Sequence, residues 1–316
     1  MPEVSAETGP QTEGRSRLPS GKAGRLMKLA TYASVSVAAI LVAAKLAAWL
    51  MTDAVSLLST LIDSLMDAGA SLLNLVAVRH ALAPADKEHR FGHGKAEALA
   101  GLAQAAFICG SAVFLVIEAG ERLFNPQAIE NTVIGYGVMV LAIVLTTALV
   151  GFQRHVIAET GSIAITADSL HYRMDILVNA GVIVSLMLAG GLGWLGADPV
   201  FALAITGYIL WGAWRIGVTA MNMLMDRELG DEDRREITAI ALAQPGVLGL
   251  HDLRTRSSGS QVFIQMHLEM DGGISLHESH VISDRVEAKV REAFPNAEVL
   301  IHEDPEGVEE ERAVFH

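Results

Sequence analysis

The sequence is almost free of cysteine and has no excess of basic residues. Its 316 residues include a single cysteine, Cys109, so an intramolecular disulfide cannot form and a zinc site built from several thiolates is excluded. The formal net charge is −13, whereas a dedicated nucleic-acid binder would carry a basic domain. A hydrophobic share of 51% and a mean hydropathy of +0.38 exclude a disordered chain as well.

Charge is distributed unevenly along the chain. Residues 1–225 contain 14 basic and 16 acidic residues, whereas residues 226–316 contain 9 basic and 20 acidic residues. The first part is therefore nearly neutral and strongly apolar, and the second part is a compact acidic segment. This division predicts two solvents, a lipid bilayer for the first part and water for the second.

Six apolar stretches in the first part are long enough to cross a bilayer, which takes about 20 mainly apolar residues in a helix. They lie near residues 28–51, 55–82, 98–120, 132–153, 161–190 and 199–224. A soluble helical core is the alternative, but soluble helices show a polar face, and the fourth stretch, TVIGYGVMVLAIVLTTALVGF, has no charged residue. The sequence therefore predicts an α-helical membrane protein with six transmembrane helices.

Basic residues in the connecting segments predict the orientation of these helices, because basic loops stay in the cytoplasm. Lysines and arginines gather before the first stretch and between the second and third, and Arg154 lies between the fourth and fifth. The opposite loops contain only Arg122. Both termini are therefore expected in the cytoplasm. The polar N-terminal residues are expected to be disordered and do not resemble a cleaved signal peptide.

Two pairs of ionisable residues lie near the middle of the second and fifth stretches, where a charge at the bilayer centre costs roughly 2.5–3.5 kcal/mol. Asp63 and Asp67 are four residues apart, as are His171 and Asp175, so each pair shares one face of its helix. Each pair lies about 10–15 residues from the end at which its helix enters, which places both pairs near mid-bilayer. Two antiparallel helices then present three carboxylates and one imidazole at the same depth.

Three carboxylates and one imidazole suit a four-coordinate divalent metal such as zinc. The negative surplus would let the empty site hold protons, and metal loading would release them, with His171 best suited to titrate near neutral pH. Iron(II), cadmium, cobalt or manganese could use the same donors, and a set of buried polar contacts between helices is the structural alternative. Asp168 could lie on the inner path to the site, and Arg173 is expected to point away from it.

A histidine-containing loop, ALAPADKEHRFGHGKAE, follows the second stretch. Asp86, His89 and His93 are spaced three and four residues apart, and two nearby glycines permit a tight loop. A second metal site is one interpretation, and a solvated polar loop is the other. No fourth protein ligand is evident, so a metal here would be held weakly or transiently.

The acidic segment predicts a small α+β domain with the order helix–strand–strand–helix–strand. The corresponding stretches are DEDRREITAIALAQP, VLGLHDLRTRSSG, SQVFIQMHLEM, SLHESHVISDRVEAKVREAFP and AEVLIHEDP. Alternation in the second strand separates two faces: Val262, Ile264, Met266 and Leu268 on one, and Phe263, Gln265, His267 and Glu269 on the other.

Six histidines also lie in this segment. His251, His267 and His302, together with Asp304, fall on or at the ends of strands, whereas His277 and His280 fall on the second helix. Surface histidines are the ordinary interpretation, but clustering across three adjacent strands favours a metal role. A His/Asp set without cysteine suits zinc at moderate affinity, as a sensor would need.

The order and spacing of these motifs in a membrane context resemble the cation diffusion facilitator family, closely its bacterial zinc-exporting YiiP-type members. The resemblance runs from about residue 25 to residue 305. It is carried by LIDSLMDAGASLLNL, LAPADKEHRFGHGKAEALAGL, ADSLHYRMD, LHDLRTRSSG, FIQMHLEM and VLIHEDP.

The resemblance implies a homodimeric metal(II)/proton antiporter with six helices and a ferredoxin-like, metallochaperone-like cytoplasmic domain. It implies a transport site of Asp63, Asp67, His171 and Asp175, and a loop site of Asp86, His89 and His93. It further implies a binuclear cytoplasmic site, linking the two subunits, of His251, His267, His280, His302 and Asp304. A charge pair between Lys95 and Asp226 would tie the two domains together near the dimer interface. The resemblance assigns no role to His277.

Together these features predict a zinc exporter of the bacterial inner membrane, which is not an enzyme and takes protons as the counter-ion. The expected domains are a disordered segment 1–24, a transmembrane domain 25–225, a metal-binding domain 226–305 and an acidic tail 306–316. The expected partners are a second copy of the chain, the lipid bilayer and divalent metal ions, with zinc also a regulatory ligand, and no nucleic acid. The alternatives are a non-transporting membrane metal sensor or scaffold, a transporter of an organic cation, and an exporter mainly of Fe²⁺, Cd²⁺ or Mn²⁺.

Overall fold

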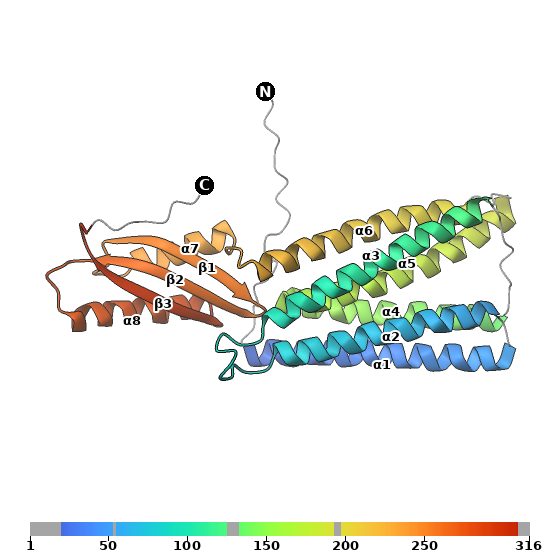
Figure 1. Cartoon of the computed structure of the whole chain (residues 1–316), viewed down its shortest axis with the longest axis horizontal. Coiled ribbons are helices and arrows are strands. Elements are labelled where there is room, and N and C mark those ends of the chain that lie inside the picture. The colour runs from blue at the N-terminus through green and yellow to red at the C-terminus, as the bar shows by residue number, and fades with distance from the viewer. Residues whose placement is uncertain (1–19, 53–54, 125–132, 193–196, 309–316) are drawn as a thin grey trace, which may run out of the picture.

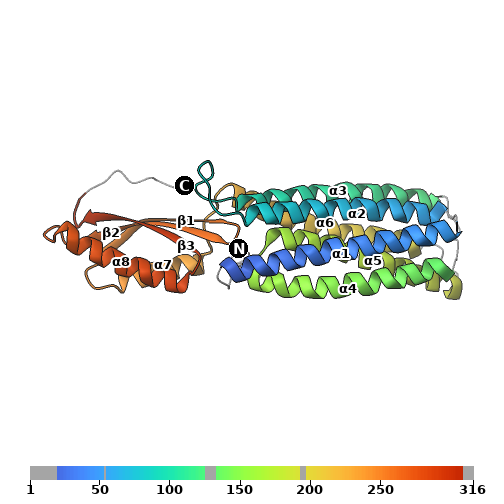
Figure 2. The same ribbon diagram turned by 90° about the horizontal axis from the view of Figure 1, so that it is seen from below.

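The computed structural model describes residues 20–52, 55–124, 133–192 and 197–308, and these form a helical bundle followed by a smaller sheet domain (Figure 1). The helices of the bundle run side by side, and the sheet domain continues from one end of the bundle in both views (Figures 1 and 2). The bundle consists of α1 (Ser20–Thr52), α2 (Val55–Ala81), α3 (Lys95–Phe124), α4 (Val133–Thr160), α5 (Ile163–Leu192) and α6 (Ala197–Leu224).

Each of these helices covers one of the six apolar stretches expected from the sequence. The helix ends differ by a few residues, as is usual for boundaries derived from composition. α1 begins at Ser20, so residues 20–24, which were expected to be disordered, are helical. Residues 1–19 and 309–316, at the two ends of the chain, lie outside the described residues.

Five of the helices are long and apolar enough to cross a membrane within the described part of the chain: Gly21–Met51, Thr60–Ala81, Lys95–Ile117, Gly137–Thr160 and Val200–Leu224. α5 is not among them. Its first half carries Asp168, His171, Arg173 and Asp175, and residues 162–172 are almost entirely buried inside the bundle. Six long helices are therefore confirmed, whereas a sixth membrane span remains a prediction.

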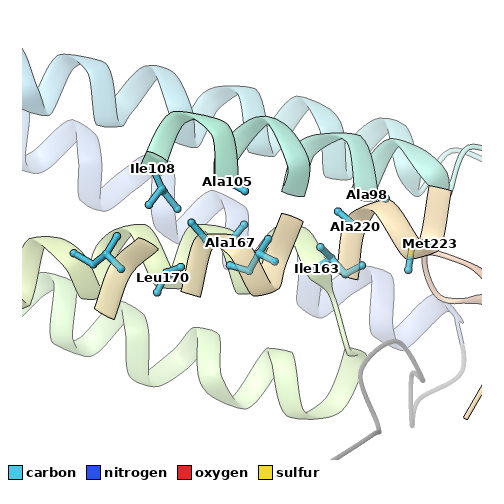
Figure 3. Packing of buried hydrophobic residues seen from close by; sticks show 11 residues of the cluster. Ala98, Ala105, Ile108, Ile163, Ala167, Leu170, Ala220 and Met223 are labelled. Atoms are coloured by element: carbon cyan, nitrogen blue, oxygen red, sulfur yellow. The ribbon is translucent and has the colours of Figure 1, made fainter. Parts of the chain in front are cut away.

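Small residues line the contacts between α3, α5 and α6, where Ala98, Ala105 and Ala167 are almost fully buried (Figure 3). A Cβ atom added to Gly101 would lie 2.6 Å from the Ile163 side chain. Small side chains let helix backbones approach closely, which is how helices pack in lipid. The outward face is apolar, as contact with lipid requires, with Trp214 71% exposed.

The sheet domain consists of α7 (Asp231–Leu242), β1 (Gly249–Ser258), β2 (Gln261–Met270), α8 (Leu276–Ala293) and β3 (Ala297–Pro305), which confirms the predicted order. β2 is the central strand, antiparallel to β1 and parallel to β3. The parallel pair needs a crossover, which α8 supplies. Both helices lie on one face of the sheet (Figure 2), where their apolar side chains and those of β2 form the core: Ile237, Ala241, Val262, Ile264, Met266, Leu268, Val286 and Val290.

Phe263 follows the alternation expected in β2, but it is buried. It shares the open face of the sheet with Gln265 and His267, yet it is only 5% exposed. The ring of Phe91, in the loop after α2, meets it edge-on at a centroid distance of 5.6 Å. The guanidinium carbon of Arg256 lies 4.6 Å from the Phe263 centroid. The open face of the sheet is therefore covered at this point by the membrane part.

Candidate metal centres

One candidate metal-binding group lies inside the bundle, between α2 and α5. One ligand atom each from Asp67, His171 and Asp175 lies within 4.8 Å of the others. His171 Nε2 is 3.0 Å from Asp67 Oδ1, and the two side chains are 4% and 22% exposed. Since His171 and Asp175 are one turn apart, they project from the same face of α5. Two carboxylates and an imidazole thus converge in a sheltered place, and these donors are compatible with a divalent cation.

Asp63, the fourth residue of the expected transport site, lies one helical turn before Asp67 on α2 and is exposed. Its carboxylate is not among the atoms that fall within 4.8 Å of one another. The structure therefore brings together three of the four expected ligands. Asp63 as a ligand remains a prediction.

Neighbouring rings and hydrogen bonds hold the imidazole of His171 in place. Its ring centroid is 5.9 Å from that of Phe107 and 5.7 Å from that of Tyr172. The Tyr172 hydroxyl lies 2.8 Å from Ser71 Oγ, one turn beyond Asp67 on α2. His171 Nδ1 is buried and has no hydrogen-bond partner among the described residues. Nε2 is therefore the ring nitrogen that faces the Asp67 carboxylate.

A second group lies in the loop between α2 and α3. Asp86 Oδ1 is 3.3 Å from His89 Nδ1, and Asp86 Oδ2 is 3.2 Å from His93 Nε2. These three expected residues offer ligand atoms within 4.8 Å of one another. The backbone N–H of His89, which donates to Asp86 at 2.6 Å, lowers the pKa of Asp86. The carboxylate therefore stays ionised, as metal binding requires.

His80 stands beside this loop group and was missed from the sequence. It lies in the last turn of α2, and its ring centroid is 4.6 Å from that of His93. The rings of His89 and His93 are 4.7 Å apart. The available signal was that His80 directly precedes the loop in the sequence, so that the last turn of α2 can share a site with it.

A third group lies on the open face of the sheet, where three histidines form a row across the strands. His251 is paired with His267 between β1 and β2, and His267 is paired with His302 between β2 and β3. Asp304 joins them: its carboxylate oxygens are 2.8 Å from His267 Nδ1, 3.1 Å from His302 Nε2 and 3.4 Å from His251 Nε2. The Asp304 side chain is 7% exposed, so its carboxylate is buried beside the three histidines.

Two residues change the composition of this third group. Glu269, missed from the sequence, places Oε1 2.8 Å from His251 Nδ1. His280 was expected in the group, but it lies on α8 with a 68% exposed side chain and Nε2 3.7 Å from Asp284. Four of the five expected residues therefore come together, and His280 lies apart. His277 is also exposed, at the start of α8.

The nitrogens of His251 are close to carboxylates without being hydrogen-bonded to them. Both ring nitrogens are buried and have no partner in hydrogen-bond geometry within the described residues, although Glu269 and Asp304 lie 2.8 Å and 3.4 Å away. A buried polar atom without a partner is costly. A cation bound between one of these nitrogens and the carboxylate beside it would give that nitrogen a partner.

The expected charge pair lies where the bundle meets the sheet domain. Lys95 Nζ at the start of α3 is 2.9 Å from Asp226 Oδ1, just after α6. Arg256 Nη1 on β1 lies 3.3 Å from the same oxygen and was not foreseen. Partial burial acts to raise the pKa of Asp226, but the hydrogen bonds and charges of Lys95 and Arg256 outweigh it and lower the pKa.

Two further ionisable residues of α5 lie beside the group in the bundle. Asp168 is completely buried, and its partners come from α1 and α4, so it does not face an open inner path. Arg173 is partly buried, and its Nε has no hydrogen-bond partner among the described residues.

A bundle with an apolar outer face, carboxylates and an imidazole inside it, and a histidine row on an attached sheet define a membrane protein that handles metal cations. Residues 31–225 match the family described as the cation efflux transmembrane domain, and residues 229–306 match the cation efflux protein cytoplasmic domain. The chain belongs to the cation efflux family, also called the cation diffusion facilitators, and is a multi-pass membrane transporter of metal cations.

Two relatives of similar length agree with this assignment. The cation-efflux pump FieF of Shewanella oneidensis is 50% identical over 283 residues, which cover 90% of this chain and 95% of the relative. FieF of Klebsiella pneumoniae subsp. pneumoniae is 48% identical over 285 residues, with coverage of 90% and 95%. Among solved structures, the zinc form of CzrB is 32% identical with a TM-score of 0.26, and covers 27% of this chain and 99% of that chain.

Proposed function

We propose that this transporter exports zinc from the cytoplasm in exchange for protons, and that Asp67, His171 and Asp175, with Asp63, form its transport site. The observation that carries the proposal is the convergence of three ionisable side chains within 4.8 Å inside a helical bundle. Such groups are expensive in a membrane and are found there mainly where they act. The nitrogen and oxygen donors suit zinc.

The charges of these groups explain why the metal would exchange with protons. Three carboxylates and a neutral imidazole exceed the charge of one divalent ion, so the empty site attracts protons, which the entering metal displaces. Inward-moving protons would in turn displace the metal on the outer side. Alternating access requires that metal and protons bind the inward-open and outward-open states with different affinities. Asp63 would complete the ligand set when the metal is bound.

The distribution of basic residues supports an inner-membrane location with both termini in the cytoplasm. We further propose that the domain of residues 226–305 extends into the cytoplasm, pairs with a second copy of the chain and binds zinc as a regulatory ligand through His251, His267, His302 and Asp304. His280, on an exposed helix face, would join that site only in the dimer. The acidic segment would raise the local concentration of divalent cations at the entrance.

The test is metal flux in proteoliposomes, with a dye that reports counter-moving protons. We expect Asp67→Ala and His171→Ala to lower zinc flux by more than about 100-fold, since groups in the outer shell of a metal site are already worth 10–100-fold. Asp284→Asn is the matched control, because Asp284 is an exposed carboxylate on α8, and it should transport normally.

The same assay separates the alternatives. Zinc flux that survives both substitutions would overturn the proposed site. Flux of an organic cation in place of zinc, lost with Asp67→Ala but not with His171→Ala, would indicate an organic-cation transporter, which needs no imidazole. No flux in the unaltered protein, together with zinc binding, would indicate a sensor or scaffold. Parallel runs with Fe²⁺, Cd²⁺ and Mn²⁺ would identify the preferred metal.

A further inference from the structure

Asp168 is a completely buried carboxyl group that the proposed transport site does not use. It lies on α5, one helical turn before His171, and its side chain is 0% exposed. It belongs to none of the metal-binding groups found among the described residues. A buried carboxyl group inside a membrane bundle is expensive, so its surroundings must compensate for its burial.

The partners of Asp168 come from two other helices. Asp168 Oδ2 lies 2.5 Å from Ser34 Oγ on α1 and 2.7 Å from Gln153 Nε2 on α4. Gln153 Nε2 also donates to Ser34 Oγ at 3.0 Å. Ser34 and Gln153 are themselves 0% exposed. Three buried polar side chains thus meet at one point and join α1, α4 and α5.

The number of hydrogens at this point indicates the protonation state. Ser34 Oγ is within hydrogen-bonding distance of two acceptors, Asp168 Oδ2 at 2.5 Å and the Ala30 carbonyl at 3.1 Å, but a serine hydroxyl has one hydrogen. A proton on Asp168 Oδ2 resolves the conflict: the carboxylic acid donates to Ser34 Oγ, and Ser34 donates to Ala30. Gln153 has two amide hydrogens, one for Ser34 and one for Asp168.

Burial favours the same protonation state of Asp168 and outweighs the nearby imidazole of His171, which favours the ionised form. No lysine or arginine forms an ion pair with Asp168 among the described residues, and its Oδ1 has no hydrogen-bond partner there. α1, α3 and α4 present only neutral groups to it, namely Ser34, Gln104 and Gln153. The titratable groups near it are His171 and Tyr172 on its own helix. An isolated carboxylate in such a place takes up a proton instead of remaining charged.

We propose that Asp168 is a proton-binding site separate from the metal-binding group in the bundle, and that its proton holds α1 against α5. A series of contacts leads from Asp168 through Ser34 and Tyr172 toward the metal-binding group, but it contains none of the residues of that group. Tyr172 OH, hydrogen-bonded to Ser71 on α2, donates at 3.1 Å to the Ser34 carbonyl. Asp168 is therefore a positioning residue for the helix that carries His171. This proposal does not require that the metal group transports zinc.

The test uses the full-length protein in lipid without metal, studied by infrared spectroscopy at neutral pH. The wild type should show carbonyl stretching absorption of protonated carboxylic acids, and Asp168→Asn should lose the component that comes from Asp168. The asparagine amide has the shape of the neutral acid and can donate to Ser34, but its NH2 group cannot also accept from Gln153, so this variant should lower the thermal unfolding midpoint only slightly. Ser34→Ala removes the acceptor and should shift this component to higher wavenumber without abolishing it.

Proton release on zinc binding, measured by calorimetry in two buffers, tests the separation from the metal group. Asp168→Asn should release as many protons per zinc as the wild type, whereas His171→Gln should release fewer. Identical infrared spectra of the wild type and Asp168→Asn would overturn the protonated state. Fewer protons released by Asp168→Asn would overturn the separation. Unchanged release by His171→Gln would count against the proposed transport site and leave the inference about Asp168 standing.

Discussion

The backbone of Gly94, at the end of the loop after α2, lies directly against the backbone of Ser258 at the end of β1. A Cβ atom added to Gly94 would stand 2.2 Å from the Ser258 carbonyl oxygen. Real Cβ atoms do not approach a neighbour that closely, and a backbone oxygen cannot rotate away. This contact joins the membrane part to the sheet domain, and its closeness depends on glycine.

Replacing Gly94 with alanine should therefore separate the loop from β1. We expect Gly94→Ala to lower the free energy of unfolding by about 1–3 kcal/mol, the usual cost of an overpacked contact. Limited proteolysis of the segment between α6 and α7 should become faster at the same time. Gly110→Ala is the control, because nothing lies within 4 Å of the added Cβ on α3. Equal rates of proteolysis in both variants would show that the contact between Gly94 and Ser258 does not hold the sheet domain against the membrane part.

The ion pair of Lys95 and Asp226, next to this contact, should contribute little to the free energy of unfolding, and its contribution should depend on pH. Lys95 and Asp226 are 37% and 41% exposed, and partly exposed pairs are worth at most about 1 kcal/mol. Because the pKa of Asp226 is lowered in the folded state, its contribution is present above the ordinary value of 3.8 and is lost as the pH falls through the lowered value. The unfolding curves of the wild type and Asp226→Asn should differ near neutral pH and converge in acid.

Replacing Lys95 and Arg256 separately would show which cation matters more. Lys95→Gln leaves Arg256 as a partner for Asp226, so it should cost less than Asp226→Asn. Arg256→Gln also removes the contact with the Phe263 ring, so it should cost more than Lys95→Gln. A cost of Lys95→Gln equal to that of Asp226→Asn would show that the pair of Arg256 with Asp226 contributes nothing.

Features that depend on local spacing were predictable from the sequence. The helices of the bundle follow from apolar runs, and the pairs on α2 and α5 follow from a spacing of four residues. The order of elements in the sheet domain follows from periodicity that changes from helical to alternating. His251, His267 and His302 were expected together because neighbouring strands were expected to pair.

Features that depend on which elements pack together were not predictable. Phe263 is buried because a loop from the membrane part covers it, and Glu269 reaches His251 because β1 and β2 pair in one particular register. The meeting of Ser34, Gln153 and Asp168 requires the arrangement of three helices. Only the family resemblance placed His280 with the histidines of the sheet. Within one chain His280 lies apart from them, on the exposed side of α8.

The position of Glu269 leads to a prediction about metal binding by the sheet domain. Its carboxylate lies 2.8 Å from His251 Nδ1 and either binds the metal or orients the imidazole. Glu269→Gln keeps the shape of the side chain and removes the charge, so zinc affinity at this site should fall about 10-fold, within the 10–100-fold range of outer-shell effects. Glu298→Gln, at an exposed position on β3, is the control. Equal zinc affinity in the two variants would show that Glu269 has no part in the site.

The position of His80 leads to a prediction about the loop group, which has three ligands within the loop itself. His80 stands against His93, whose side chain is 7% exposed and whose Nδ1 is buried without a hydrogen-bond partner in the described part of the chain. A fourth imidazole would complete the tetrahedral set that zinc prefers. His80→Phe retains a ring that can pack on His93 and removes the nitrogens, so zinc affinity at the loop should fall about 10-fold.

The measurement for His80 needs a background in which zinc binds only to the loop. Such a background is a chain that carries Asp67→Ala with His171→Ala and His267→Ala with Asp304→Ala, because each pair removes two ligands of its group, and calorimetry then reports the loop alone. His89→Phe should abolish binding there, because it removes a residue that already faces Asp86 at 3.3 Å. Affinity unchanged by His80→Phe would mean that the site has three protein ligands and takes its fourth from water, and that it releases zinc more readily than a four-ligand site would.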